Sequence, residues 1–226
     1  DNLFMKIGID ARMVGVHFTG IGRYTFELIR HLGGLDTHNE YVLFLRKEGF
    51  DDFRLPGPRF TKVLADYPHY SFGEQMGFLK LINAQNLDLM HFTHFNAPIF
   101  YTRPSIVTIH DLTLSFFPGN KMNNPLHRAG YHVTLRAAVR HAKKIIAVSN
   151  CTKKDLEKML DVPSEKIEVI YEAVNEEFEK NENQHEIKNT LKKYEIGRPY
   201  LLYTGVWRNH KNLANLIKAF SRLRHH

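Results

Sequence analysis

The chain has 226 residues, of which 43% are hydrophobic, a globular composition that can bury a sizeable core in one large domain or two small ones. Its net charge of +7 favours anionic partners such as phosphates, nucleic acid or lipid head groups. The single Cys151 excludes an internal disulfide, and the sequence shows no signal peptide and no apolar run of about 18 residues. We therefore expect a cytoplasmic protein without a membrane span.

The first part of the chain alternates short β-type runs with helical patterns. Residues 6–10 (KIGID) form such a run, and the apolar spacing that follows predicts a helix from near Gly22 to Gly33 and Gly34. Strand, glycine loop and helix are the opening of a βαβ unit. The patterns that follow predict strands at residues 41–46, 60–65 and 88–92, a loop at 56–58 and an amphipathic helix over 72–85.

The run at residues 105–112 (SIVTIHDL) ends in a histidine and an aspartate. Its β-branched residues are nearly continuous, which is typical of an inner strand of a parallel sheet. His110 and Asp111 would then lie at the carboxyl end of that strand, where ligands bind in open α/β sheets. The alternative is a polar strand end at which Asp111 caps a helix.

The alternation continues through the middle of the chain. A loop is expected at residues 118–125, a long helix at 126–143 and a strand at 144–148. Ser149 is a good N-cap for a helix through Leu160 that Pro163 stops, and residues 167–171 resemble a strand. The series predicts an α/β fold: a Rossmann-like, doubly wound parallel sheet.

Composition changes abruptly at residues 175–184, which are rich in glutamate and asparagine. We place a first domain at residues 5–174, a linker at 175–198 and the truncated start of a second Rossmann-like domain at 199–226. A polar helix at 186–194, a strand at 200–204, a glycine and a helix at 213–223 repeat the first βα unit. One βα unit cannot enclose a core of its own.

Glycines and basic residues are the candidates for phosphate binding. Gly20 and Gly22 lie at a predicted helix N-terminus, where free N–H groups favour an anion, although a tight turn also needs glycine. Arg208 and Lys211 occupy the corresponding loop of the second unit, where they could clamp a diphosphate or be solvated surface charges. The third glycine of the dinucleotide fingerprint is missing and Arg46 ends the second strand, so binding of NAD is disfavoured.

Two further patterns have alternative interpretations. His91 and His94 could ligate a metal, but no third and fourth ligand stands nearby in sequence, so no metal site is predicted. The second pattern is a basic series at four-residue spacing, which is either a solvated helix face or a surface that lies against anionic lipid. Its members are Arg128, His132, Arg136, Arg140 and Lys144.

Six motifs together carry a resemblance to family 4 glycosyltransferases of the GT-B fold. In chain order they are KIGIDARMV, TGIGRYTFELIRHL, TIHDL, KKIIAVSNCTKKDL, IEVIYEAVN and YTGVWRNHKNLANLIKAF. The resemblance runs from Lys6 to Phe220. It implies two Rossmann-like domains facing a cleft, in which the first mainly holds the acceptor and the second binds a nucleotide-diphosphate sugar.

The resemblance also implies roles for individual residues. His110, with Asp111 beside it, matches the active-site histidine near the transferred sugar, and Gly20 and Gly22 approach the donor phosphates. Lys211 matches the lysine that neutralises the diphosphate leaving group. Arg208 matches less well, because many relatives have arginine where this chain has Val206 or His210.

The implied function is a retaining glycosyltransferase of polysaccharide or glycolipid biosynthesis. It would move a hexose, with mannose preferred, from a nucleotide-diphosphate sugar to a glycan or lipid-linked acceptor, without a cofactor or an obligatory metal. Nucleic acid is not expected as a partner, whereas peripheral contact with an anionic membrane at its inner face is. The 226 residues alone are expected to be inactive. The alternative is a GT-B-like sugar-nucleotide epimerase or a noncatalytic module that binds a phosphate ligand.

Overall fold

The structure, a computed structural model, describes residues 4–15, 20–118, 124–174, 180, 182–197 and 199–223. Parts of the expected loop at 118–125 and of the expected linker at 175–198 lie outside these ranges, as does Thr19 beside Gly20. The chain forms two compact units, Asp1–Glu172 and Ala173–His226, and each is described by itself.

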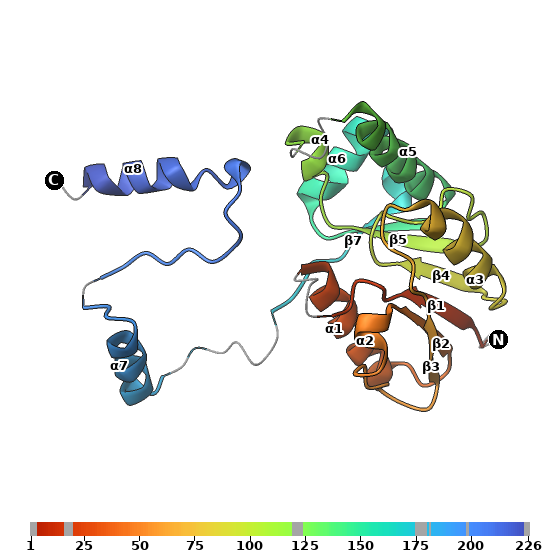
Figure 1. The fold of residues 1–226 in the computed structure, drawn as a ribbon, viewed down its shortest axis with the longest axis horizontal. Coiled ribbons are helices and arrows are strands. Elements are labelled where there is room, and N and C mark those ends of the chain that lie inside the picture. The colour runs from red at the N-terminus through yellow and green to blue at the C-terminus, as the bar shows by residue number, and fades with distance from the viewer. Residues whose placement is uncertain are drawn as a thin grey trace. The chain divides into compact units, whose positions relative to one another are not determined.

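The first unit is built on a sheet of seven parallel strands in the order β3-β2-β1-β4-β5-β6-β7 (Figure 1). This confirms the α/β class with a doubly wound parallel sheet. The strands are β1 (Lys6–Asp10), β2 (Glu40–Leu45), β3 (Phe60–Leu64), β4 (Leu89–Phe92), β5 (Ser105–Ile109), β6 (Lys144–Ala147) and β7 (Ile167–Val169).

The inner strands are buried on both faces, which explains their nearly continuous apolar sequences. In β2, Val42 and Phe44 join the core on one face, and Leu43 and Leu45 join the core on the other. Helices α1 (Gly20–Leu35) and α2 (Lys47–Phe50) cover the second of these faces, and α3 (Leu79–Asn83), α5 (Pro125–His141) and α6 (Asn150–Leu160) cover the first (Figure 1). This split follows from the strand order, because right-handed crossovers in opposite directions place their helices on opposite faces.

The helix expected at residues 72–85 has a less regular start. It contains a π-helical segment, η1 (Glu74–Phe78), that continues directly into α3. Gly77 of this segment packs closely on the ring of Tyr67, where a β-carbon would clash. Glu74 at its first position is fully buried, so the irregular turn fixes an ionisable side chain inside the unit.

Local capping explains where the next helices begin. Asn124 accepts a hydrogen bond from the N–H of Leu126, and Pro125 occupies the first turn of α5. The hydroxyl of Ser149 accepts from the N–H of Thr152 at 3.0 Å, which confirms Ser149 as the N-cap of α6. The short helices α2 and α4 (Thr113–Phe116) and the 3-10 turn η3 (Ser164–Lys166) were not predicted, because so few residues show no periodicity.

The second unit contains α7 (Gln184–Lys193), a 3-10 turn η4 (Asn209–Lys211) and α8 (Leu213–Leu223). Both helices were expected, but the strand predicted at 200–204 is wrong: residues 199–204 have no strand pairing, and Leu201 and Leu202 are exposed. A β-strand requires a hydrogen-bonded neighbour, and the described residues of this unit supply none. The predicted second βα unit is therefore present here as a helix without its strand.

Candidate active site

The candidate site lies at the carboxyl edge of the sheet in the first unit. Strands β1, β4 and β5 are neighbours and parallel, so their ends at Asp10, Phe92 and Ile109 meet along one edge. This edge is where doubly wound sheets bind ligands. The residues that follow these ends supply the site's polar groups.

His110 directly follows β5, and its imidazole ring makes three contacts. Its Nε2 is 3.0 Å from the carbonyl oxygen of Thr93, and its Nδ1 is 2.9 Å from Oε1 of Glu172. The ring of Tyr24 packs edge-on against the imidazole, with 4.9 Å between ring centroids. The imidazole side chain is 14% exposed, so it is oriented by the protein yet reachable from solvent.

A polar layer beneath His110 joins α1 to β4 and β5. The hydroxyl of Thr108 lies 3.1 Å from the Tyr24 hydroxyl and 2.9 Å from Nε2 of His91. Thr108 and His91 are buried, whereas Tyr24 lies at the surface of the layer. The Tyr24 side chain therefore fixes the first turns of α1 against the same strand end that carries His110.

The predicted glycines lie in this first part of α1. The helix begins at Gly20, so the N–H groups of Gly20 and Gly22 belong to the turn that has no intrahelical acceptors. Gly22 is buried, and a β-carbon at Gly20 would meet no atom within 4 Å. The structure thus brings Gly20, Gly22 and His110 to one edge through Tyr24.

Asp111 has a local contact. Its Oδ1 accepts a hydrogen bond from the N–H of Thr113 at 2.8 Å, at the entry to α4. This is a local turn at a polar strand end, but the N-cap of α4 is Leu112, so Asp111 is not the helix cap of the alternative interpretation. A catalytic role for Asp111 stays a prediction.

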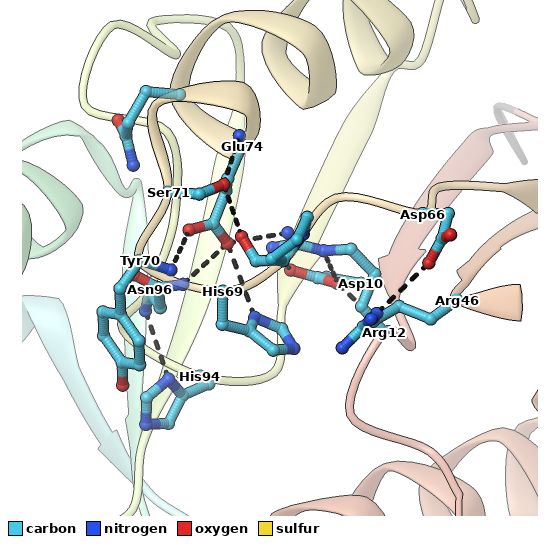
Figure 2. A network of polar contacts seen from close by, with 12 residues as sticks. Asp10, Arg12, Arg46, Asp66, His69, Tyr70, Ser71, Glu74, His94 and Asn96 are labelled. Carbon is cyan, nitrogen blue, oxygen red and sulfur yellow. Dashed lines mark hydrogen bonds and ion pairs between the residues drawn. The ribbon is translucent and has the colours of Figure 1, made fainter. Parts of the chain in front are cut away.

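A buried ionic cluster of Asp10, Arg12 and Glu74 lies at the carboxyl end of β1 (Figure 2). Arg12 binds both carboxylate oxygens of Asp10, at 2.8 and 2.7 Å, and its Nη1 is 2.6 Å from Oε1 of Glu74. The guanidinium also lies 3.8 Å from the ring centre of Phe78. Arg12 and Glu74 are almost fully buried, so these charges depend on one another for solvation.

The carboxylate of Glu74 collects further donors from the surrounding loops. The side-chain amide of Asn96 donates to Oε1 at 2.6 Å and the N–H of Tyr70 to Oε2 at 2.7 Å, and His69 lies beside it (Figure 2). The hydroxyl of Thr93 donates to the carbonyl of Asp10. Thr93 thus links the cluster to His110.

The charges of the cluster determine its titration. Burial by itself would raise the pKa of Asp10, but the charge and hydrogen bonds of Arg12, with a smaller effect of His69, outweigh it and the pKa is lowered. Burial would likewise lower the pKa of Arg12, and Asp10 and Glu74 instead raise it. Asp10 and Arg12 are therefore both ionised at neutral pH.

The two histidines considered as metal ligands are neutral. Burial, and then the nearby His110, lowers the pKa of His94 to about 3, and burial lowers the pKa of His91 to about 4. Nδ1 of His94 accepts from the N–H of Asn96, and Nε2 of His91 is occupied by Thr108. Among the described residues, no group of three His, Cys, Asp or Glu side chains is arranged to hold a metal ion.

Arg208 and Lys211 belong to the second unit. Arg208 precedes η4 in an extended conformation, and the N–H of Lys211 donates to its carbonyl at 2.9 Å. Both side chains are exposed. Their role in binding phosphate stays a prediction.

Sequence reasoning missed four members of this edge: Arg12, Tyr24, Glu74 and Glu172. Arg12 had a weak signal, because an arginine directly after a buried strand needs a carboxylate partner. Glu74 had no signal, and Glu172 lies within the IEVIYEAVN motif but was not singled out there. Each meets its partner from 62 positions away in the chain.

The family comparison covers most of this unit. The model of Glycosyltransferase Family 4 matches residues 18–178. The O-antigen chain mannosyltransferase RfbU of Salmonella typhimurium is 26% identical over 222 residues, 93% of this chain and 57% of that protein. The O-antigen chain mannosyltransferase B of Escherichia coli is 24% identical over 240 residues, 97% of this chain and 60% of that protein. The chain thus spans about three fifths of the curated relatives it matches.

Solved structures share the fold at low sequence identity. A glycosyltransferase from Rickettsia africae aligns with a TM-score of 0.55 and 16% identity, over 100% of this chain and 59% of that one. HepE of Anabaena, solved in complex with UDP and glucose, aligns with a TM-score of 0.53 and 16% identity, over 84% of this chain and 50% of that one. Because the family model spans well over half of the 226 residues, the chain belongs to Glycosyltransferase Family 4.

Proposed function

We propose that the protein is a retaining glycosyltransferase that moves a hexose from a nucleotide-diphosphate sugar to a glycan or lipid-linked acceptor. The observation that carries the proposal is the position of His110. It stands at the carboxyl edge of the sheet, partly exposed, next to the N-terminal turn of α1. The alternatives are a sugar-nucleotide epimerase and a noncatalytic module that binds phosphate.

The reaction breaks the bond between the sugar C1 and the diphosphate oxygen and joins C1 to an acceptor hydroxyl, whose proton is released. Negative charge builds on the departing diphosphate, so its stabilisation is the main electrostatic task. The N–H groups at Gly20 and Gly22 and the positive end of the 16-residue α1 favour an anion at this edge. Lys211 and Arg208 would supply cationic charge from the second unit.

Mannose is the proposed sugar, and an O-antigen polysaccharide is the proposed context. Both O-antigen relatives are named mannosyltransferases, at 26% and 24% identity. HepE was solved with UDP and with UDP-glucose, which supports a nucleotide-sugar donor for the fold. A nucleotide-sugar panel therefore has to include both mannose and glucose donors.

The acceptor is proposed to be lipid-linked, with α5 contacting an anionic membrane at its inner face. Arg128, Arg136 and Arg140 are exposed on α5. Burial and then the charges of Arg136 and Arg128 lower the pKa of His132, so positive charge is crowded on this helix. In the described part of the chain, no helix is long and apolar enough to cross a bilayer. Binding to vesicles that contain phosphatidylglycerol, and its loss in the triple glutamine variant of these arginines, would test the contact.

The activity test uses the full-length protein with radiolabelled nucleotide sugars and a lipid-linked acceptor extract, with and without EDTA. We expect transfer that survives EDTA and a product whose anomeric configuration, read by NMR, equals that of the donor. His110→Ala and Lys211→Ala should each lower turnover by about 100-fold or more while keeping the melting temperature, a typical effect of removing one catalytic group. Lys158→Ala, an exposed lysine near the end of α6, is the control.

The 226-residue chain alone should show no transfer, because Lys211 would neutralise a phosphate only with its loop held opposite Gly20 within a fraction of an ångström. Conversion of the donor sugar to its epimer without an acceptor would favour the epimerase. Binding of nucleotide sugar without turnover would favour the noncatalytic module. Full activity in both alanine variants would show that the chemistry lies on other residues.

A further inference from the structure

We propose that Glu172 is a positioning residue of the transfer reaction: its carboxylate holds the His110 imidazole with a proton on both ring nitrogens. The inference rests on the proposed function, because it assigns a role to Glu172 only through His110. Glu172 lies 62 positions after His110, inside the IEVIYEAVN motif, and no sequence pattern assigns it a role.

The first step concerns Nε2 of His110. Its partner at 3.0 Å is the backbone carbonyl of Thr93, which can only accept a hydrogen bond. Nε2 must therefore carry a proton. The carbonyl follows the buried strand β4, and the Thr93 hydroxyl is itself bonded to the carbonyl of Asp10 at 2.7 Å, so this side of the ring is fixed by the core.

The second step concerns Nδ1. Its partner at 2.9 Å is Oε1 of Glu172, and an ionised carboxylate is also only an acceptor. A neutral imidazole has one N–H and cannot donate to both groups. With both hydrogen bonds formed, His110 is an imidazolium, and Glu172 supplies its counter-charge.

Other titratable groups surround the ring. His91 on β4 and His94 after it both interact electrostatically with His110, and burial keeps them neutral at physiological pH. Tyr24 on α1 presents the edge contact to the ring and directs its hydroxyl to Thr108. Asp111 is adjacent in the chain, and its Oδ1 is engaged by Thr113. Among these groups, Glu172 is the carboxylate that the structure places within hydrogen-bond distance of the ring.

His110 and Glu172 differ in how far their side chains are exposed, and this difference suits different roles. The His110 side chain is 14% exposed and that of Glu172 is 48% exposed. Glu172 follows β7 and is the last residue of the first unit, so its side chain is not part of the core. Its removal should leave the fold intact and change the state of His110. An imidazolium beside the phosphate-favouring turn of α1 supplies positive charge where the leaving group develops negative charge.

The test compares Glu172→Gln, Glu172→Ala and wild type in the full-length protein, with Glu168→Gln, at an exposed position of β7, as the matched control. The glutamine oxygen still accepts from Nδ1 but lacks the charge that favours the imidazolium. We expect Glu172→Gln to keep kcat near about pH 6 and to lose about tenfold near about pH 8, where a histidine without a counter-charge is neutral. Glu172→Ala should lower kcat at both pH values, with KM for the donor changed less than twofold in all variants.

A second measurement does not depend on turnover. In protein labelled with 15N-histidine, with His110 assigned by His110→Asn, wild type should show two protonated ring nitrogens near about pH 8. Glu172→Gln should show one unprotonated Nδ1 at the same pH, and Glu168→Gln should match wild type.

The outcomes separate this inference from the proposed function. If wild type transfers sugar and both Glu172 variants follow the control in the pH profile and in the nitrogen spectrum, Glu172 has no positioning role and the function stands. If the nitrogen spectrum changes as expected but no donor sugar is transferred, the proposed glycosyltransferase function is wrong, whereas the effect of Glu172 on the protonation of His110 stands. Loss of kcat with an unchanged spectrum would also overturn the inference.

Discussion

At the scale of single residues, the most consequential side chain outside the expected set is Arg12. It is 1% exposed and bridges two buried carboxylates. A buried ion pair contributes little net stability compared with an apolar replacement of the whole group, but breaking one partner is expensive. A single substitution of Arg12 therefore leaves the buried side chains of Asp10 and Glu74 without their cationic partner.

We predict that Arg12→Met lowers the free energy of unfolding by about 3 to 5 kcal/mol, because Asp10 and Glu74 stay buried without their cation. Arg54→Met, at an exposed position, should change it by less than about 0.5 kcal/mol. Urea unfolding followed by circular dichroism measures both. Adding Asp10→Asn and Glu74→Gln to Arg12→Met should recover part of the loss, and equal effects of the two arginine variants would contradict the prediction.

Buried His91 gives the fold a predictable sensitivity to acid. Its pKa is about 4 in the folded protein, against about 6.5 for an unperturbed histidine. Between these values the unfolded chain binds more protons, so stability falls as the pH is lowered from about 6.5 to about 4, by at most about 3 kcal/mol. Asp10, whose pKa is lowered, adds its own loss at still lower pH.

The variant His91→Gln should be less stable at neutral pH, because it disturbs a buried hydrogen bond to Thr108. Its unfolding free energy should also depend less on pH, because the titrating imidazole is gone. Unfolding free energies measured across the same pH range would show the smaller slope. A wild-type slope in the variant would mean that His91 does not titrate as described.

At the scale of elements, capping determines how well α6 is anchored beside β6. The Ser149 hydroxyl satisfies the N–H of Thr152, one of the groups that a helix start leaves open. We predict that Ser149→Ala costs about 1 kcal/mol in chemical denaturation. Ser164→Ala, in the short turn η3, is the control and should cost much less, and a reversal of this order would refute the capping role.

The π-helical segment η1 is a local irregularity that the hydrophobic pattern of residues 72–85 does not predict. The amphipathic sequence of residues 72–85 predicts a continuous α-helix, and the observed wide turn instead places Glu74 against Arg12. Gly77 allows this turn to lie on the Tyr67 ring. The local sequence thus indicates the helix, whereas the contact of its first turn with the distant Arg12 appears only in the folded structure.

At the scale of the whole molecule, the two units differ in how much they bury. The first has cores on both faces of its sheet, whereas Leu201, Trp207 and Ile217 of the second are exposed. The two curated relatives are longer than this chain. We propose that, in a protein of their length, the additional residues form strands and helices that cover these exposed apolar side chains. The same additional strands would pair with residues 200–204.

Amide hydrogen exchange tests this proposal. In the 226-residue chain, we predict slow exchange in β1, β4 and β5 and fast exchange at residues 200–204, since those amides have no ladder partner. In the longer protein, residues 200–204 should become protected. Slow exchange there in the 226-residue chain would show that a strand forms without additional sequence.

By itself, the sequence determined the seven strands of the first unit, most of its longer helices and the position of His110 at a strand end. These features depend on apolar runs, periodicity, caps and turn residues that are local in the chain. Only the tertiary structure decided the partners of Arg12 and His110 and the absence of a strand at 200–204. Each depends on groups brought together by folding, or on a neighbouring strand, and a contact across 62 positions leaves no periodic trace in one sequence.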